Sequence, residues 1–112
     1  MTRLKFVNKE FILELMENKD KFKLVEALRE DDFAKGHLPN ALNIPATEDK
    51  MEELFSELLP DKGELIVVYC SDYLCGASTG VAKFLQGKGY ENVMDYKGGK
   101  KDWVDAGLPL ME

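Results

Sequence analysis

The run Glu64–Cys70 (ELIVVYC) constrains the fold more than any other stretch of this 112-residue chain. It is almost continuously apolar and has β-branched residues at its centre. A strand with one face in water alternates apolar and polar residues, whereas a strand covered by helices on both faces does not. We therefore expect Glu64–Cys70 to be a central strand of a parallel sheet.

The rest of the chain alternates short apolar runs with amphipathic segments, which is typical of alternating strands and helices. Asn8 and Thr47 are each expected to cap a helix. The expected strands lie within residues 4–7, 22–28, 41–45, 64–70 and 92–96. The expected helices follow Asn8, Arg29 and Thr47 and cover about Ser78–Lys88 and 98–107. The pattern predicts one domain over residues 1–112, a three-layer α/β fold with a mostly parallel central sheet flanked by helices.

Charge and composition exclude several functions. Fifteen basic and 21 acidic residues give a net charge of −6, so neither nucleic acid nor a membrane surface is an expected partner. No apolar run approaches the ~18 residues of a membrane span, and no signal pattern begins the chain, so we expect a cytoplasmic protein. Two cysteines and one histidine cannot complete a structural zinc site, and no metal or other cofactor is expected.

Cys70 has two interpretations. It ends the expected central strand, and ligands of open α/β sheets bind beyond the carboxyl ends of strands. A loop leading into a helix N-terminus would lower the pKa of a thiol there and make it a nucleophile. A free cysteine at a strand end is also a common packing residue. The small, polar loop that follows, SDYLCGASTG, favours the nucleophile because it suits close wrapping around a ligand.

Two separated motifs resemble those of one family. The segment DFAKGHLPNALNIP is similar to the GHIPGAINIP-type segment of rhodanese domains. The cysteine loop YCSDYLCGAS, the helix after it and a GG-x₃-W-x₃-GLP ending resemble the rest of that family, so the likeness covers about Leu24–Leu110. The resemblance implies a rhodanese fold with five parallel strands. It also implies transfer of sulfane sulfur from a donor such as thiosulfate to cyanide or a thiol.

In that family the cysteine of the active loop carries the sulfur as a persulfide, and by motif position this cysteine is Cys70. The resemblance implies that backbone N–H groups of the loop hold the donor. The substrate would be a small sulfur-containing anion or a thiol, and a protein could also accept the sulfur. The expected substrate-binding residues are Ser71, Asp72, Tyr73, Leu74, Cys75, Gly76, Ala77 and Ser78.

The loop departs from the family pattern. Cys70–Ala77 spans eight residues, which is longer than the typical active loop, and it contains Asp72 but no arginine or lysine. Weaker binding of a dianion is therefore expected. Glu26 and Leu28 replace the usual Asp-Val-Arg ending of an earlier strand, which alters the polar bracing of the loop. Gly76 stands where a C-x₅-R phosphatase needs arginine, so phosphatase chemistry is not expected.

Cys75 has no counterpart in the family pattern, and three roles remain open for it. It could be a small loop residue, a resolving thiol that attacks a persulfide or sulfenate on Cys70, or the nucleophile itself. The function also has three candidates. These are a sulfurtransferase, a persulfide carrier or protein-binding module with little activity, and a Cys70–Cys75 redox sensor.

Four other positions carry expectations. His37 is expected to be structural, hydrogen-bonded to neighbouring backbone. Trp103 is expected to pack in the core. Tyr73 and Leu74 should project from the loop, either to shield its base or to form an apolar rim for an acceptor.

Overall fold

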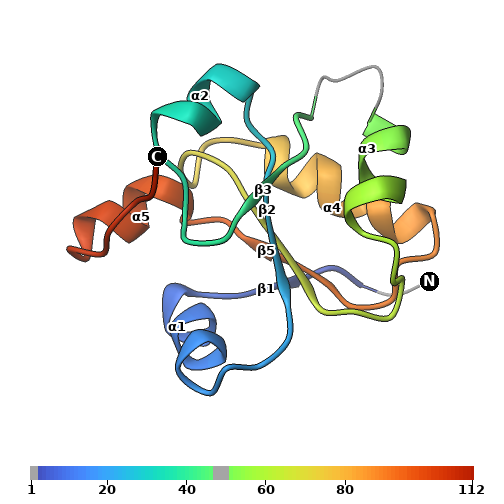
Figure 1. The fold of residues 1–112 in the computed structure, drawn as a ribbon, viewed down its shortest axis with the longest axis horizontal. Coiled ribbons are helices and arrows are strands. Elements are labelled where there is room, and N and C mark those ends of the chain that lie inside the picture. Colours follow the sequence, from blue (N-terminus) through green and yellow to red (C-terminus); the bar gives the residue numbers. More distant parts are fainter. Residues whose placement is uncertain (1–2, 47–50) are drawn as a thin grey trace.

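Strands and helices alternate along the chain in the computed structural model, which describes residues 3–46 and 51–112 (Figure 1). The expected order of elements is confirmed. The strands are β1 (Lys5–Phe6), β2 (Lys23–Glu26), β3 (Leu42–Asn43), β4 (Ile66–Tyr69) and β5 (Val93–Tyr96). The helices are α1 (Lys9–Glu17), α2 (Glu30–Lys35), α3 (Met51–Leu58), α4 (Ala77–Gly87) and α5 (Gly99–Asp105).

The five strands form one parallel sheet in the order β1-β5-β4-β2-β3. Central β4 pairs with β2 on one side and β5 on the other, so Val68 lies between Val25 and Asp95. Every residue of β4 is buried, as its continuous apolar composition predicts. The three-layer α/β fold is therefore confirmed, and all pairings between the named strands are parallel.

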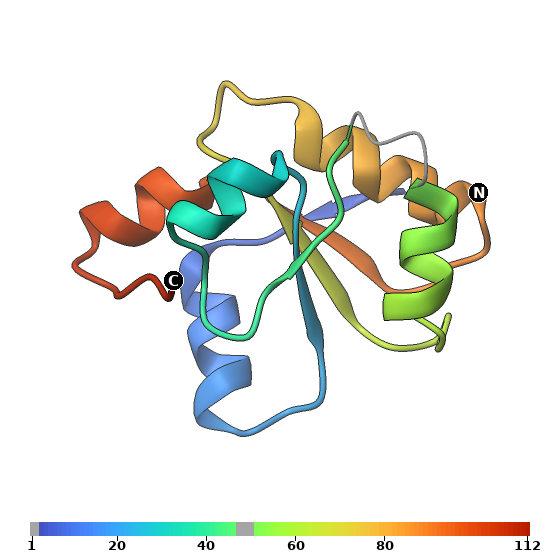
Figure 2. The same cartoon turned by 45° about the horizontal axis from the view of Figure 1, so that its top comes forward.

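Helices cover both faces of the sheet (Figure 2), and an apolar core lies on each face. Successive side chains of β4 alternate between them because strand side chains point to opposite faces. Ile66, Val68 and then Cys70 join the core under α3 and α4, whereas Val67 and Tyr69 join the core that contains residues of α1 and α5. Cys70 therefore continues the face of the sheet on which α4 packs.

Helix boundaries agree with most of the expected signals. The Asn8 side chain accepts a hydrogen bond from the Phe11 N–H at 3.0 Å, which confirms the predicted cap. The expected cap Thr47 lies outside the described residues. Helix α4 begins at Ala77 after Gly76, one residue earlier than expected, so Ser78 is inside its first turn. Within residues 3–46 and 51–112, no helix has the length and apolarity needed to cross a membrane.

Candidate functional site

Cys70 directly follows the last residue of β4, and six loop residues separate it from the start of α4. Its side chain is completely buried in this arrangement. Ser78, one residue into α4, is also completely buried, and its Oγ has no hydrogen-bond partner among the described residues. The expected nucleophile therefore lies at the carboxyl end of the central strand, where α/β domains bind ligands.

The base of the loop, defined here as Cys70 and Ser71, is held by the first turn of α5. The backbone N–H of Lys100 donates to the Cys70 carbonyl at 3.0 Å, and that of Lys101 donates to the Ser71 carbonyl at 2.9 Å. Gly99 permits this approach: its φ is +62°, and an added Cβ would lie 2.3 Å from the Cys70 oxygen. Gly99 belongs to the GG-x₃-W motif, but the motif alone does not predict this contact.

A buried polar network supports the base of the loop. Glu26 is fully buried, and its carboxylate accepts from the Tyr69 hydroxyl at 2.8 Å and pairs with Lys100 Nζ at 2.9 Å. The Tyr69 hydroxyl in turn accepts from the Leu38 N–H. Burial raises the pKa of Glu26, although the hydrogen bonds from Lys100 and Tyr69 oppose that rise. Burial and the neighbouring Glu26 likewise raise the pKa of Tyr69. The sequence predicted that Glu26 alters the polar contacts at the base of the loop. In the structure, the polar partner of Glu26 is Lys100 of α5.

The tip of the loop, defined here as Asp72–Cys75, is organised by Asp72. Its side chain accepts from the Leu74 N–H at 3.0 Å, and its carbonyl accepts from the Cys75 N–H at 3.1 Å. These two N–H groups therefore serve the turn rather than a ligand. Tyr73 and Leu74 project from the tip, and Leu74 is 95% exposed, as expected from the sequence.

The two thiols of the loop differ in burial and in proton affinity. Cys70 Sγ donates to the Cys75 carbonyl at 3.4 Å, and Cys75 itself is half-buried. Burial, followed by the Cys75 thiol, raises the pKa of Cys70, although Ser78 opposes that rise. Burial alone would raise the pKa of Cys75. Hydrogen bonds from the Cys70 thiol and from Ala77 and Ser71 outweigh the effect of burial, so the pKa of Cys75 is lowered overall.

The expectation that the loop lowers the pKa of Cys70 is therefore wrong. The reason is that desolvation of a fully covered Sγ outweighs the donors around it. The lowered pKa belongs to Cys75 instead.

The loop itself has no lysine or arginine, but two lysines that follow β5 along the chain lie beside it. Lys97 Nζ donates to the Cys75 carbonyl at 2.9 Å, and Lys100 Nζ also donates to the Asp32 carbonyl at 2.9 Å. A shallow cavity of about 370 Å³ opens between the base of the loop and α2, with Ser71, Lys35 and Lys100 in its wall. Sequence reasoning missed these lysines because they lie far from Cys70 along the chain and belong to no local motif.

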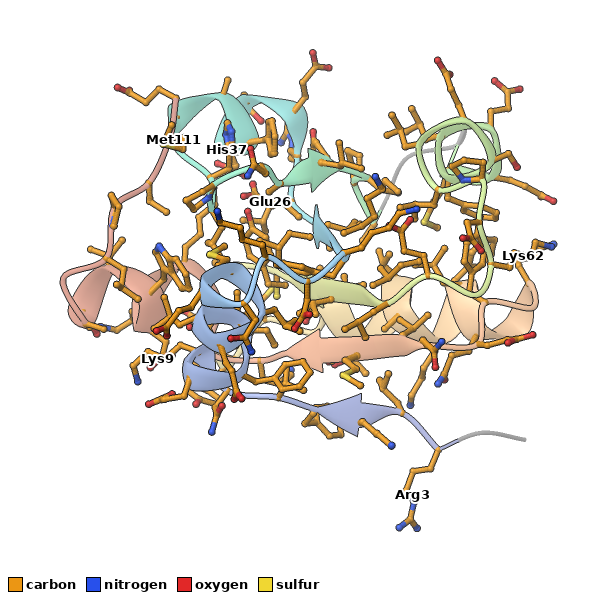
Figure 3. All side chains as sticks on the ribbon, turned by 60° about the horizontal axis from the view of Figure 1, so that its bottom comes forward. Arg3, Lys9, Glu26, His37, Lys62 and Met111 are labelled. Atoms are coloured by element: carbon orange, nitrogen blue, oxygen red, sulfur yellow. The ribbon has the colours of Figure 1, made fainter. Side chains whose placement is uncertain are left out.

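His37 and Trp103 occupy structural positions, as expected. His37 Nδ1 lies 3.0 Å from the Phe33 carbonyl, its ring stacks on Phe33 at 3.9 Å, and its backbone pairs with Met111 (Figure 3). Trp103 is 1% exposed and donates its indole N–H to the Pro109 carbonyl. Neither side chain hydrogen-bonds to the two thiols.

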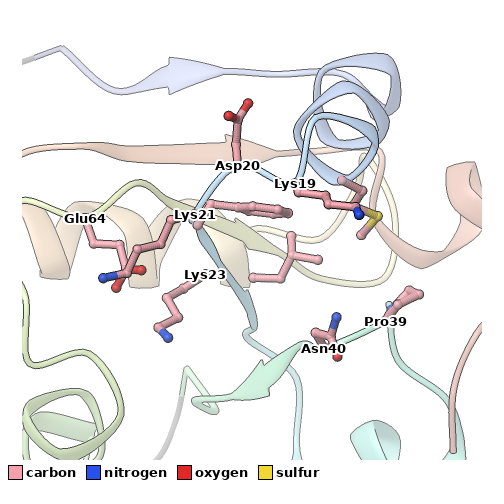
Figure 4. Close-up of a pocket in the computed structure, with 10 residues that line it drawn as sticks. Lys19, Asp20, Lys21, Lys23, Pro39, Asn40 and Glu64 are labelled. Carbon is pink, nitrogen blue, oxygen red and sulfur yellow. The ribbon is translucent and has the colours of Figure 1, made fainter.

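Another cavity, of about 290 Å³, lies at the N-terminal ends of the strands, near the start of β2 and just before β4 (Figure 4). Lys21, Lys23 and the largely buried Glu64 are among the residues that line it. It is remote from Cys70, because the cysteine lies at the other end of β4. Across the described parts of the chain, no three His, Cys, Asp or Glu side chains gather closely enough to bind a metal ion.

Comparisons with known proteins place the geometry in context. The family model described as "Rhodanese-like domain" matches residues 9–106. The chain is 32% identical over 89 residues to the HTH-type transcriptional regulator Rv0324 of Mycobacterium tuberculosis, a match over 80% of this chain. It is 34% identical over 102 residues to the adenylyltransferase and sulfurtransferase UBA4 of Candida albicans, over 85% of this chain. The matches span only 37% and 23% of these two relatives.

Among solved structures, the polysulfide-sulfur transferase homodimer of Wolinella succinogenes superposes with a TM-score of 0.75. The match covers 96% of this chain and 78% of that one at 20% sequence identity. At this identity the likeness establishes a shared fold.

Proposed function

The chain belongs to the rhodanese-like domain family, and on that premise we propose that it is a sulfurtransferase whose Cys70 carries the sulfane sulfur as a persulfide. The observation that carries the proposal is the position of Cys70. It directly follows the central strand, it precedes α4, and its carbonyl is held by the Lys100 N–H. A nucleophile whose backbone is fixed in this way meets each donor in the same geometry.

The reaction has two transfers. With thiosulfate, the Cys70 thiolate forms a bond to the sulfane sulfur, the sulfur–sulfur bond of the donor breaks, and sulfite leaves with the electron pair. With a polysulfide, the shortened polysulfide leaves instead. An acceptor thiolate then attacks the outer sulfur of the persulfide and releases Cys70. Loop residues within Ser71–Ser78 would bind the donor and the departing anion, except through the N–H groups of Leu74 and Cys75, which bond to Asp72.

A polysulfide-type donor suits this site better than thiosulfate. The loop has an acid, Asp72, and no cation of its own, and the nearby lysines Lys97 and Lys100 already make hydrogen bonds to carbonyl oxygens. The three sulfonate oxygens of thiosulfate would gain little from such surroundings, whereas a polysulfide has no such oxygens to bind.

A persulfide carrier that passes sulfur to a partner protein is the second candidate. The raised pKa of Cys70 favours it, because a protonated thiol reacts slowly with free donors. Either function suits a reducing compartment such as the cytoplasm, where two free thiols persist.

Intact-mass measurement after treatment with polysulfide or thiosulfate tests the proposal. The wild-type protein should gain sulfur on Cys70, and cyanide should then release thiocyanate. Cys70→Ser should abolish thiocyanate release. Turnover with polysulfide but not thiosulfate supports the donor preference, and loading without turnover supports the carrier. Undiminished thiocyanate release by Cys70→Ser would refute the assignment of Cys70.

A further inference from the structure

The two cysteines of the loop lie on opposite sides of a boundary between interior and surface. Cys70 is fully buried and belongs to the apolar core under α3 and α4, whereas Cys75 is only packed against that core and is half-buried. Cys75 is also the last residue of the tip, which carries the exposed Tyr73 and Leu74. A large acceptor can therefore approach Cys75 more easily than Cys70.

We propose that Cys75 is the exit thiol of this site: the sulfane sulfur taken up by Cys70 passes to Cys75, from which an acceptor thiol removes it. The inference rests on the proposed function, because it needs a persulfide on Cys70. It assigns Cys75 the role of a second sulfur carrier, which differs from a resolving thiol that closes a disulfide.

The geometry directs Cys70 towards Cys75. The Cys70 Sγ donates to the Cys75 carbonyl at 3.4 Å, so the buried thiol points at the residue that would receive its sulfur. Lys97 Nζ donates to the same carbonyl at 2.9 Å, which also fixes the Cys75 backbone. The Cys75 N–H donates to the Asp72 carbonyl, so both ends of the residue are held.

The transfer balances without an oxidant or reductant. The Cys75 thiolate attacks the outer sulfur of the Cys70 persulfide, a new bond forms between these two sulfurs, and the bond from the outer sulfur to Cys70 Sγ breaks. The electron pair stays on Cys70 Sγ, which takes the proton of the transferred sulfhydryl. Cys70 becomes a thiol and Cys75 an ionised persulfide, so the total charge of the pair is unchanged.

The proton affinities of the two thiols determine where the shared proton rests. The lowered pKa of Cys75 keeps a thiolate available for the attack, and the raised pKa of Cys70 lets it retain the proton after the sulfur leaves. When an acceptor thiolate later removes the sulfur from Cys75, Cys75 is again a thiolate beside a protonated Cys70. The pair returns to its starting state after each cycle, and one proton is shared throughout.

Sulfur mapping on the full-length protein tests the inference. The wild-type protein, Cys70→Ser, Cys75→Ser and Cys75→Ala are loaded with polysulfide, trapped with an alkylating reagent and digested, and the extra sulfur is located by mass spectrometry. We expect sulfur on both cysteines of the wild-type protein and on Cys70 alone in both Cys75 variants. Transfer to glutathione should slow at least about tenfold in the Cys75 variants. Transfer to cyanide, which is small enough to reach Cys70, should fall much less.

The outcomes separate failure of the inference from failure of the proposed function. Glutathione transfer at the wild-type rate in the Cys75 variants overturns the exit role while leaving the Cys70 persulfide intact. A disulfide between the two cysteines with release of sulfide, instead of sulfur on Cys75, also overturns it, because the attack would then fall on the inner sulfur. If Cys70→Ser loads Cys75 and turns over as the wild-type protein does, the proposed role of Cys70 fails as well. Loss of Cys70 loading in the Cys75 variants overturns the order of the two carriers.

Discussion

The base and the tip of the cysteine loop are adjacent in sequence but are held by different parts of the molecule. The base is held from outside, by backbone N–H groups of α5 and by the buried Glu26–Lys100 pair. The tip is held mainly by its own Asp72 and by Lys97. The base is therefore tied to the rest of the fold, whereas the tip depends on a few contacts of its own. This contrast teaches that the position of Cys70 and the surface around it are determined by separate interactions.

Substitution at Gly99 should disturb the base most. In Gly99→Ala the new Cβ would lie 2.3 Å from the Cys70 carbonyl oxygen, at a φ of +62° that already disfavours alanine. We expect the free energy of unfolding to fall by about 4 kcal/mol, since backbone must move as well as adopt a strained conformation. Urea denaturation monitored by Trp103 fluorescence measures this.

Gly107→Ala is the matched control. Gly107 also has a positive φ, +79°, but its added Cβ would meet no atom within 4 Å. It should lose only about 1 kcal/mol, the cost of the backbone conformation alone. Equal losses in the two variants would show that the contact between Gly99 and the base of the loop contributes nothing.

The buried pair under the base predicts a pH dependence. Because burial raises the pKa of Glu26 above its ordinary 4.5, the folded protein keeps a proton that the unfolded chain has released. The free energy of unfolding should therefore fall as the pH rises from about 4.5 through the pKa of the folded state. Glu26→Gln should flatten this decrease, which denaturation at a series of pH values would detect.

Lys100→Met should enlarge that decrease, because it removes the cation that stabilises ionised Glu26. We expect a loss of about 3 kcal/mol at pH 7 and a smaller loss at pH 5. The double variant Glu26→Gln, Lys100→Met should recover most of the loss at pH 7. An equal loss from Lys100→Met at both pH values would mean that the ion pair does not support the base.

The smallest effect is expected at the tip. Asp72→Ala removes the side chain that accepts from the Leu74 N–H, and exposed hydrogen bonds of this kind contribute about 1 kcal/mol or less. Stability should barely change, whereas alkylation of Cys75 should change in rate because its turn is loosened. Alkylation of Cys70 in the same sample is the internal reference and should stay constant. A stability loss as large as that of Gly99→Ala would erase the distinction between base and tip.

Much of this organisation was predictable from the sequence. The apolar run before Cys70 predicted a central parallel strand, and the Asn8 cap and the core position of Trp103 follow from local patterns. These features depend on near neighbours along the chain or on hydrophobicity alone. They are the features that local patterns report.

The chemistry around Cys70 was less predictable. Its partner Lys100 comes from a helix far along the chain, and nothing in a surface-type lysine indicates that it will pair with buried Glu26. The direction of the pKa shift at Cys70 depends on how completely the loop covers Sγ. A helix N-terminus predicts a lowered pKa, but desolvation reverses it, and sequence periodicity does not report the balance between the two.

The loop is fixed at both ends, by α5 at its start and by α4 at its end, and this limits how its sequence can change within such a fold. Cys70 and Ser71 are tied to α5, and Ala77 already belongs to α4, so residues inserted or deleted between Asp72 and Gly76 would change the outline of the loop without moving Cys70. Loops of different length can thus be exchanged above one fixed cysteine. Under the proposed function, acceptor choice would then evolve separately from the transfer of sulfur at Cys70.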